Sequence, residues 1–330
     1  MLVLDSHCDT PSLMIKGLDL GQNGSPAHVD LGKLKEGGVD ASFFALYTPA
    51  DISEDAAECR VFEMLGKILD AVEAYPDKAA LAFSPDDILA NKEKGLVSIL
   101  LGMENGSPIH KSLSLLRLFY RLGVRYMTLT HNGDNEIADS AAQGVRWHGL
   151  SPFGREVVDE MNRLGMIVDV AHVSDETFFD VLSCSKAPVV STHSCCRALA
   201  SHRRNMTDGM IKAMADKGGV IQINFYPVFL SDTYAALYDK YGEAASPRPT
   251  VEDVVRHIDH AVKVGGIEHV GIGTDFDGIE VTPEGLEDIS MPPRVFDQLT
   301  LKGYSEDQIE KIAGGNFLRV FNDVIYSAIG

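Results

Sequence analysis

Five short apolar segments of this 330-residue chain each end in a residue type that binds metal ions. Each segment has the length and the β-branched content of a strand buried on both faces. In a parallel β/α barrel, residues at the carboxyl ends of the strands form the active face. The pattern therefore predicts that these residues meet at one site. They are His7 and Asp9 in the first segment, then Glu104, His172, His193 and Asp275.

Eight strand patterns, each followed by a helical stretch, run along the sequence and end near Asp9, Leu46, Glu104, His131, His172, His193, Tyr226 and Phe276. Such alternation predicts either a closed parallel barrel or an open doubly wound sheet. The barrel is favoured, because candidate ligands fall on the first and the last strand and only closure brings those strands together. We therefore predict an α/β fold, a single (β/α)8 TIM-type barrel over residues 1–330 with a C-terminal helical tail.

Helical patterns separate the strands, and Ser151-Pro152 and Gly165 are typical of a helix start and a helix end. Two further segments lie outside the repeat. Residues 227–249 are predicted to form a rim or lid loop, and residues 277–330 a C-terminal tail with helices near 296–302 and 305–328. The helices predicted between the strands cover residues 55–74, 112–122, 152–164, 175–182, 207–217 and 250–264.

The amino-acid composition limits the kinds of binding partner and the cellular compartment that we expect for this protein. The formal net charge of −19 argues against nucleic acid and against an anionic membrane surface. No apolar window reaches the roughly 18 residues of a membrane span. The five cysteines lack zinc-finger spacing and favour a reduced, cytoplasmic setting, with export by a leader that precedes this sequence as the alternative.

The candidate ligands suffice for two metal ions. His7 and Asp9 share one face of a strand, because strand periodicity is two, so both can bind one ion. Glu104 can bridge two ions with one oxygen each, and His172 and His193 can complete the second. Two cations roughly 3.5–4 Å apart polarise a carbonyl and deprotonate a bridging water, so the pattern predicts hydrolysis.

Other polar residues at the predicted rim leave alternatives open. Asp275 is the candidate for proton transfer, and Asp277, one strand step further on, is its competitor. His131 either donates to a substrate carbonyl or is a structural histidine. Arg203 or Arg204 either binds a free carboxylate or remains solvated.

Nine ordered segments resemble the renal (membrane) dipeptidase family, zinc metallopeptidases of the amidohydrolase superfamily, nearly from end to end. They are Asp5-Ser-His-Cys-Asp-Thr-Pro11, Gly102-Met-Glu-Asn-Gly106, Tyr126-Met-Thr-Leu-Thr-His131, Val168-Asp-Val-Ala-His-Val-Ser174, Ser191-Thr-His-Ser194, His202-Arg-Arg-Asn205, Ile223-Asn-Phe-Tyr226, Gly273-Thr-Asp-Phe-Asp-Gly278 and Gly314-Gly-Asn-Phe-Leu-Arg-Val-Phe321.

The resemblance implies a homodimeric dipeptidase with two zinc ions per chain that acts through a metal-bridging hydroxide and often accepts a C-terminal D-residue. The membrane anchor of the mammalian members is not carried over, because no hydrophobic C-terminal tail is visible. The residue roles that it implies are His7 and Asp9 on one zinc, His172 and His193 on the other, Glu104 as the bridge, His131 and Arg204 on the substrate, and Asp275 in proton transfer.

Two rival hypotheses accompany this prediction. The first is another amidohydrolase that acts on a cyclic amide, a lactone or an N-acyl amino acid. The second is a metal-binding scaffold without catalysis, which is disfavoured because it would not require Asp275 or the rim formed by His131 and Arg204.

Overall fold

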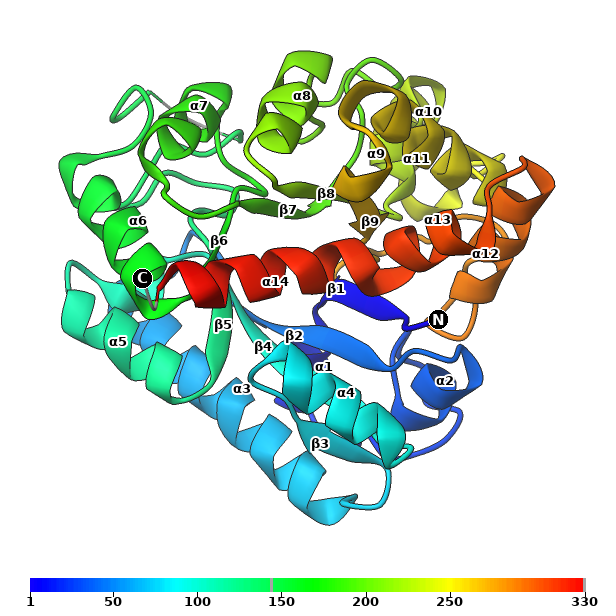
Figure 1. The fold of residues 1–330 in the computed structure, drawn as a ribbon, viewed down its shortest axis with the longest axis horizontal. Helices are drawn as coiled ribbons and strands as arrows, with labels where there is room; N and C mark the ends of the chain where they lie inside the picture. The colour runs from blue at the N-terminus through cyan, green and yellow to red at the C-terminus, as the bar shows by residue number, and fades with distance from the viewer. Residues whose placement is uncertain (143–144, 329–330) are drawn as a thin grey trace.

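The computed structural model describes residues 1–142 and 145–328. Eight parallel strands surround a central axis, and helices cover them on the outside (Figure 1). Neighbouring strands pair in the order β1-β2-β4-β5-β6-β7-β8-β9. The strands are β1 (Leu4–Cys8), β2 (Ala41–Tyr47), β4 (Val97–Glu104), β5 (Val124–Thr128), β6 (Ile167–Asp169), β7 (Val190–Ser194), β8 (Val220–Ile223) and β9 (Val270–Ile272).

The first and last strands close the sheet. The amide of Asp275 donates to the carbonyl of His7 at 3.0 Å, and the amide of Asp9 donates to the carbonyl of Phe276 at 2.8 Å. A parallel bridge also joins Cys8 to Phe276. The predicted barrel is thereby confirmed, and closure brings residues 7–9 next to residues 275–276.

Four strands end earlier than predicted: β8 stops at Ile223, three residues before Tyr226, and the other three stop before candidate site residues. β5, β6 and β9 stop three residues before His131, His172 and Asp275, respectively. These three residues therefore lie in the segments that follow the strands. His172 and Asp275 have φ angles of 66° and 62°, in the left-handed region that few non-glycine residues adopt. This backbone conformation, which strand periodicity does not predict, sets the direction of both side chains.

The six helices predicted between the strands are present, with ends shifted by up to two residues. For α6, Ser151 accepts a hydrogen bond from the amide of Gly154 at 2.8 Å, and Gly165 ends the helix at φ 74°. No helix of the described residues is both long and apolar enough to cross a bilayer. These helices are α3 (Glu54–Ala74), α5 (Leu113–Arg121), α6 (Pro152–Leu164), α7 (Asp175–Cys184), α8 (Asp208–Asp216) and α11 (Val251–Gly265).

Smaller elements complete the shell around the barrel. A short strand, β3 (Ala79–Leu81), pairs with β4 outside the barrel order and was not predicted. The remaining short helices are α1 (Thr10–Met14), α2 (Leu31–Glu36), α4 (Pro85–Glu93), and the 3-10 turns η1 (Ser107–Ile109) and η3 (Ile267–His269).

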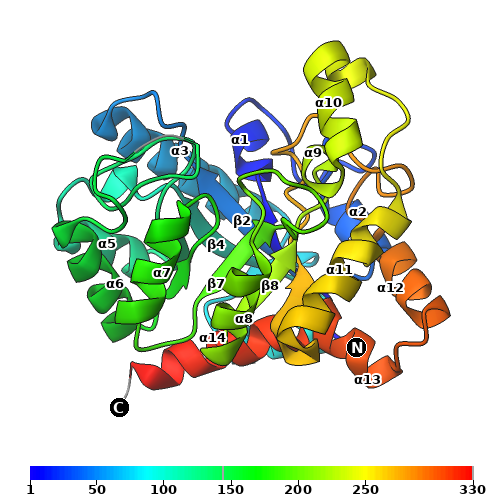
Figure 2. The same ribbon diagram turned by 90° about the horizontal axis from the view of Figure 1, so that it is seen from above.

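Most of the segment 227–249 is helical, so the prediction that this rim segment is an irregular loop is wrong. It contains α9 (Pro227–Leu230), α10 (Asp232–Tyr241) and the 3-10 turn η2 (Gly242–Ala244). Tyr234 is buried against neighbouring apolar side chains, and this burial stabilises a helix that the sequence pattern did not indicate. Figure 2 shows α10 projecting from one end of the barrel.

The tail folds as the helices α12 (Pro292–Leu301), α13 (Glu306–Glu310) and α14 (Asn316–Ser327), with a π-helical turn before α14. The predicted tail also includes residues 329–330, which lie outside the described residues. α14 crosses the end of the barrel opposite α10 (Figure 2). Its apolar side chains pack against the first residues of the strands, so this end of the barrel is filled.

Candidate active site

A cavity of about 810 Å³ opens at the end of the barrel formed by the carboxyl ends of the strands. His7 and His193 are 0% and 1% exposed and lie against its floor. The structure therefore brings all eight predicted site residues together. The six that line the cavity are Asp9, Glu104, His131, His172, Arg204 and Asp275.

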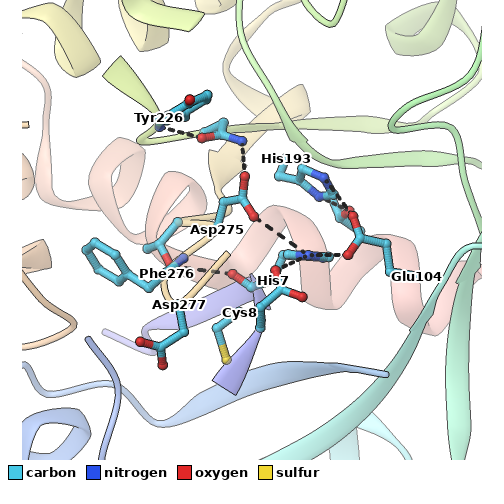
Figure 3. A network of polar contacts seen from close by, with 12 residues as sticks. His7, Cys8, Glu104, His193, Tyr226, Asp275, Phe276 and Asp277 are labelled. Atoms are coloured by element: carbon cyan, nitrogen blue, oxygen red, sulfur yellow. Dashed lines mark hydrogen bonds and ion pairs between the residues drawn. The ribbon is translucent and has the colours of Figure 1, made fainter. Parts of the chain in front are cut away.

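The carboxylate of Glu104 is the centre of this group (Figure 3). Its Oε2 lies 3.5 Å from Nε2 of His7, whereas its Oε1 lies 3.0 Å from Nε2 of His172 and 3.5 Å from Nε2 of His193. Asp9 contacts the His7 side alone, with Oδ2 at 3.4 Å from Nε2. Each oxygen of Glu104 thus faces a different set of side chains, as a carboxylate that bridges two cations requires.

Two polar atoms of the candidate ligands lack hydrogen-bond partners among the described residues. Nε2 of His7 and Oδ1 of Asp9 are buried without a hydrogen bond to any of the described residues. Nε2 of His172 and Nε2 of His193 approach to 2.9 Å. Unpaired buried polar atoms are costly, and nitrogen and carboxylate oxygen are ligands of divalent cations such as Zn²⁺. The donor set therefore fits a metal centre.

All three histidines use the other ring nitrogen to hold their orientation. In each ring Nδ1 has a partner that leaves Nε2 directed toward Glu104, the arrangement found around metal-binding histidines. The partners are the hydroxyl of Tyr126 at 2.8 Å for His7, Oδ1 of Asn132 at 3.2 Å for His172, and the hydroxyl of Thr192 at 2.9 Å for His193.

The electrostatic surroundings shift the pKa values of the three histidines in different directions. Burial, and then the positive charges of neighbouring side chains, hold the pKa values of His172 and His193 well below their usual range, so both rings are neutral donors. Burial also lowers the pKa of His7, but the charge of Glu104 and the contact with Asp9 outweigh it and raise that pKa well above its usual value.

Hydrogen bonding separates the two candidate proton-transfer residues (Figure 3). Oδ1 of Asp275 lies 3.9 Å from Nε2 of His7, and burial raises the pKa of Asp275 to about 7. Asp277 instead accepts from the hydroxyl of Thr10 at 2.8 Å and from the amide of His28 at 2.6 Å. Asp277 is thus committed to fixing loops, and Asp275 is the carboxylate that faces the cluster.

His131 and Arg204, the two candidates for substrate binding, also face the cavity. The ring of His131 lies 4.4 Å from that of His172, and its buried Nδ1 has no hydrogen-bond partner in the part of the chain that the structure describes. Burial lowers the pKa of His131, which leaves it neutral.

Arg204 and Arg203 differ in surroundings. Arg204 is only 7% exposed, and its guanidinium donates to the carbonyl of His193 at 3.1 Å and lies 5.5 Å above the ring of Phe229. Its Nε has no partner, and no carboxylate of residues 1–142 or 145–328 lies at ion-pair distance. Arg203 is exposed and donates to the carbonyl of Ala142 at 2.7 Å. Arg204 is therefore a buried cation without a counter-ion beside the cluster.

The sequence model of the family described as membrane dipeptidase, peptidase family M19, matches residues 1–328. The chain belongs to this family. An uncharacterized dipeptidase of Schizosaccharomyces pombe is 36% identical over 97% of this chain and 79% of its own length. The family consists of metallopeptidases, so this chain is a metal-dependent hydrolase of small peptides.

Two solved structures resemble the fold of this family member. The probable dipeptidase PvdM from Pseudomonas aeruginosa has a TM-score of 0.91 and 28% identity, and the comparison covers 99% of this chain and 96% of that one. A metallopeptidase from Rhodobacter sphaeroides, liganded with a phosphinate mimic of the dipeptide L-Ala-D-Ala, has a TM-score of 0.89 and 26% identity over 98% and 99% of the two chains.

Four residues that support the candidate ligands are not among the site residues predicted from the sequence. Tyr126, Asn132 and Thr192 hold the histidines, and Nδ2 of Asn224 donates to Oδ2 of Asp275 at 2.9 Å. The sequence contained one signal for them, since each lies in or beside one of the nine segments that resemble the dipeptidase family. Which ligand each one contacts follows only from the fold.

Proposed function

We propose that this dipeptidase holds two zinc ions and hydrolyses free dipeptides, including those with a C-terminal D-residue. The observation that carries the dipeptide specificity is Arg204, a buried guanidinium that has no carboxylate partner among the described residues and whose Nη2 contacts the backbone of the candidate ligand His193. A cation fixed so close to the metal centre suits a substrate whose terminal carboxylate follows the scissile bond by one residue.

In this proposal each ion has its own pair of ligands. His7 and Asp9 would hold one, His172 and His193 would hold the other, and Glu104 would bridge them with one oxygen each. When bound, the ions supply polarisation of the scissile carbonyl and a lowered pKa for water.

The remaining residues act on the substrate and on the proton. Arg204 binds the terminal carboxylate, and neutral His131 donates a hydrogen bond to the carbonyl oxygen as negative charge develops there. Asp275 accepts a proton from the attacking water and passes it to the leaving amine. Asn224, which donates to Oδ2 of Asp275, leaves Oδ1 directed toward the cluster for this transfer.

Acceptance of a D-residue and assembly as a homodimer are parts of the same proposal. Support for the D-residue comes from the R. sphaeroides relative, whose ligand mimics L-Ala-D-Ala. The homodimer rests on the family resemblance and is measured by light scattering of the purified protein.

The test is a metal-reconstituted assay. Protein stripped with a chelator and reloaded with zinc is given L-Ala-L-Ala, L-Ala-D-Ala, an amidated dipeptide, a tripeptide, an N-acetyl amino acid and a lactone. We expect the reloaded protein to bind about two zinc ions per chain and to cleave the two free dipeptides, and the stripped protein to cleave neither. One ion or none would contradict the paired centre, and preference for the N-acetyl amino acid or the lactone would favour the other amidohydrolase hypothesis.

A further inference from the structure

Tyr126 spans the interior of the barrel from the filled end toward the candidate metal centre. It lies on β5, its side chain is completely buried, and its ring packs 5.0 Å from the ring of Phe43. Phe43 in turn packs 5.2 Å from Phe317 of α14. The Tyr126 hydroxyl reaches Nδ1 of His7, on a strand three positions away in the sheet, at 2.8 Å.

A glycine on the neighbouring strand makes this position accessible to the ring. Gly102 of β4 pairs with Tyr126 in the parallel register. A Cβ atom on Gly102 would lie 2.0 Å from Cζ of Tyr126, far inside van der Waals contact. Two positions on adjacent strands are therefore matched so that a phenol fits beneath His7.

The contact with Tyr126 fixes the ring of His7. It directs Nε2 toward the carboxylates of Asp9 and Glu104, which lie 3.4 and 3.5 Å away. A histidine that binds a cation through Nε2 carries its proton on Nδ1, and a phenol oxygen can accept a hydrogen bond from that proton. Because the ring of Tyr126 is completely buried against Phe43, its hydroxyl holds His7 from a fixed position.

We propose that Tyr126 is a positioning residue that tunes the affinity of the metal position formed by His7 and Asp9, with Gly102 providing the space for its ring. This inference rests on the proposed two-metal function. Partners of this kind change metal affinity by about 10- to 100-fold when they are removed from metal-binding histidines.

The test measures zinc binding, by competition with a chromogenic chelator, in wild-type protein and in Tyr126→Phe, which removes the hydroxyl alone. We expect one of two zinc dissociation constants to rise about 10- to 100-fold and the other to stay within about 2-fold. Gly102→Ala, which displaces the ring, should weaken the same position. Tyr304→Phe is the matched control, since it removes a hydroxyl that binds Asp259 at 2.8 Å, far from the cavity.

Two further measurements separate positioning from general stability. In an Asp9→Asn background, which already weakens the same ion, Tyr126→Phe should cause little additional loss. In zinc-loaded wild-type protein, nitrogen-15 spectra should show Nδ1 of His7 carrying an exchange-protected proton. Unchanged zinc affinity in Tyr126→Phe, equal weakening of both ions, or an unprotonated Nδ1 would overturn the inference. Wild-type protein that binds fewer than two ions would instead overturn the proposed function.

Discussion

Removing the charge of Arg204 should abolish discrimination between a free and an amidated dipeptide. The guanidinium has five N–H donors, and two described bonds, to the carbonyl of His193 and the hydroxyl of Ser194, leave three for a substrate. Two of these would form a charge-assisted fork with a carboxylate. Each bond should contribute about 1.5 kcal/mol, the lower end of the range for hydrogen bonds to charged groups, because the cavity is open to water. Together the two bonds contribute about 3 kcal/mol, or about 100-fold in kcat/KM.

The assay is a double-mutant cycle between enzyme and substrate. Wild-type protein should cleave L-Ala-D-Ala about 100-fold more efficiently than its amide, whereas Arg204→Met should cleave both with similarly low efficiency. The loss should fall mainly on KM, because the carboxylate is held alike in the ground state and the transition state. Arg204→Lys keeps the charge but not the fork, so it should be intermediate.

Arg203→Met is the matched control, because Arg203 is the exposed neighbour that bonds the backbone of Ala142. It should keep the discrimination, and metal content should be unchanged in every variant. Equal cleavage of the free and amidated dipeptide by wild-type protein would refute the carboxylate contact. Loss of discrimination in Arg203→Met but not in Arg204→Met would show that the wrong arginine was chosen.

Three further predictions concern Asp275, Gly278 and His257. Asp275→Asn should lower the rate by roughly 10²–10⁴ with metal content kept, and loss of an ion on elemental analysis would make Asp275 a ligand. Gly278→Ala should reduce metal occupancy, because its Cβ would lie 2.2 Å from Oδ2 of Asp9, whereas Gly209→Ala, with 3.8 Å to its nearest atom, should not. Burial lowers the pKa of His257 from 6.5 to about 4. Its contribution to stability is therefore present above pH 6.5 and lost toward pH 4, by roughly 3 kcal/mol. His257→Gln should unfold in urea with a weaker dependence on pH over this range, and an identical dependence would contradict the assignment.

Most residues of the candidate site could be predicted from the sequence because they lie at or just after the end of a strand, and a strand is recognised locally as an apolar, β-branched run. The position of a ligand type at the end of such a run needs no knowledge of distant residues. The order of the runs was enough to favour closure, since candidates on the first and last strands, such as His7 and Asp275, meet only in a barrel. The family resemblance added the roles.

The tertiary structure decided every choice that depends on contacts between distant parts of the chain. Asp277 was set apart from Asp275 by bonds to Thr10 and His28, which precede it by 267 and 249 residues. The helical rim segment also depends on burial of Tyr234 against side chains that the local pattern does not reveal. Periodicity reports which face of an element is apolar, but not which remote side chain meets it.

The support beneath the metal centre shows the same limit most clearly. Tyr126 and His7 are 119 residues apart, and their contact requires both the closed barrel and the absence of a side chain at Gly102. The sequence by itself therefore determined the barrel and the candidate ligands, because both arise from local, repeated patterns. The fold alone decided how those ligands are oriented, because orientation depends on hydrogen bonds and free space that arise only when the strands are assembled.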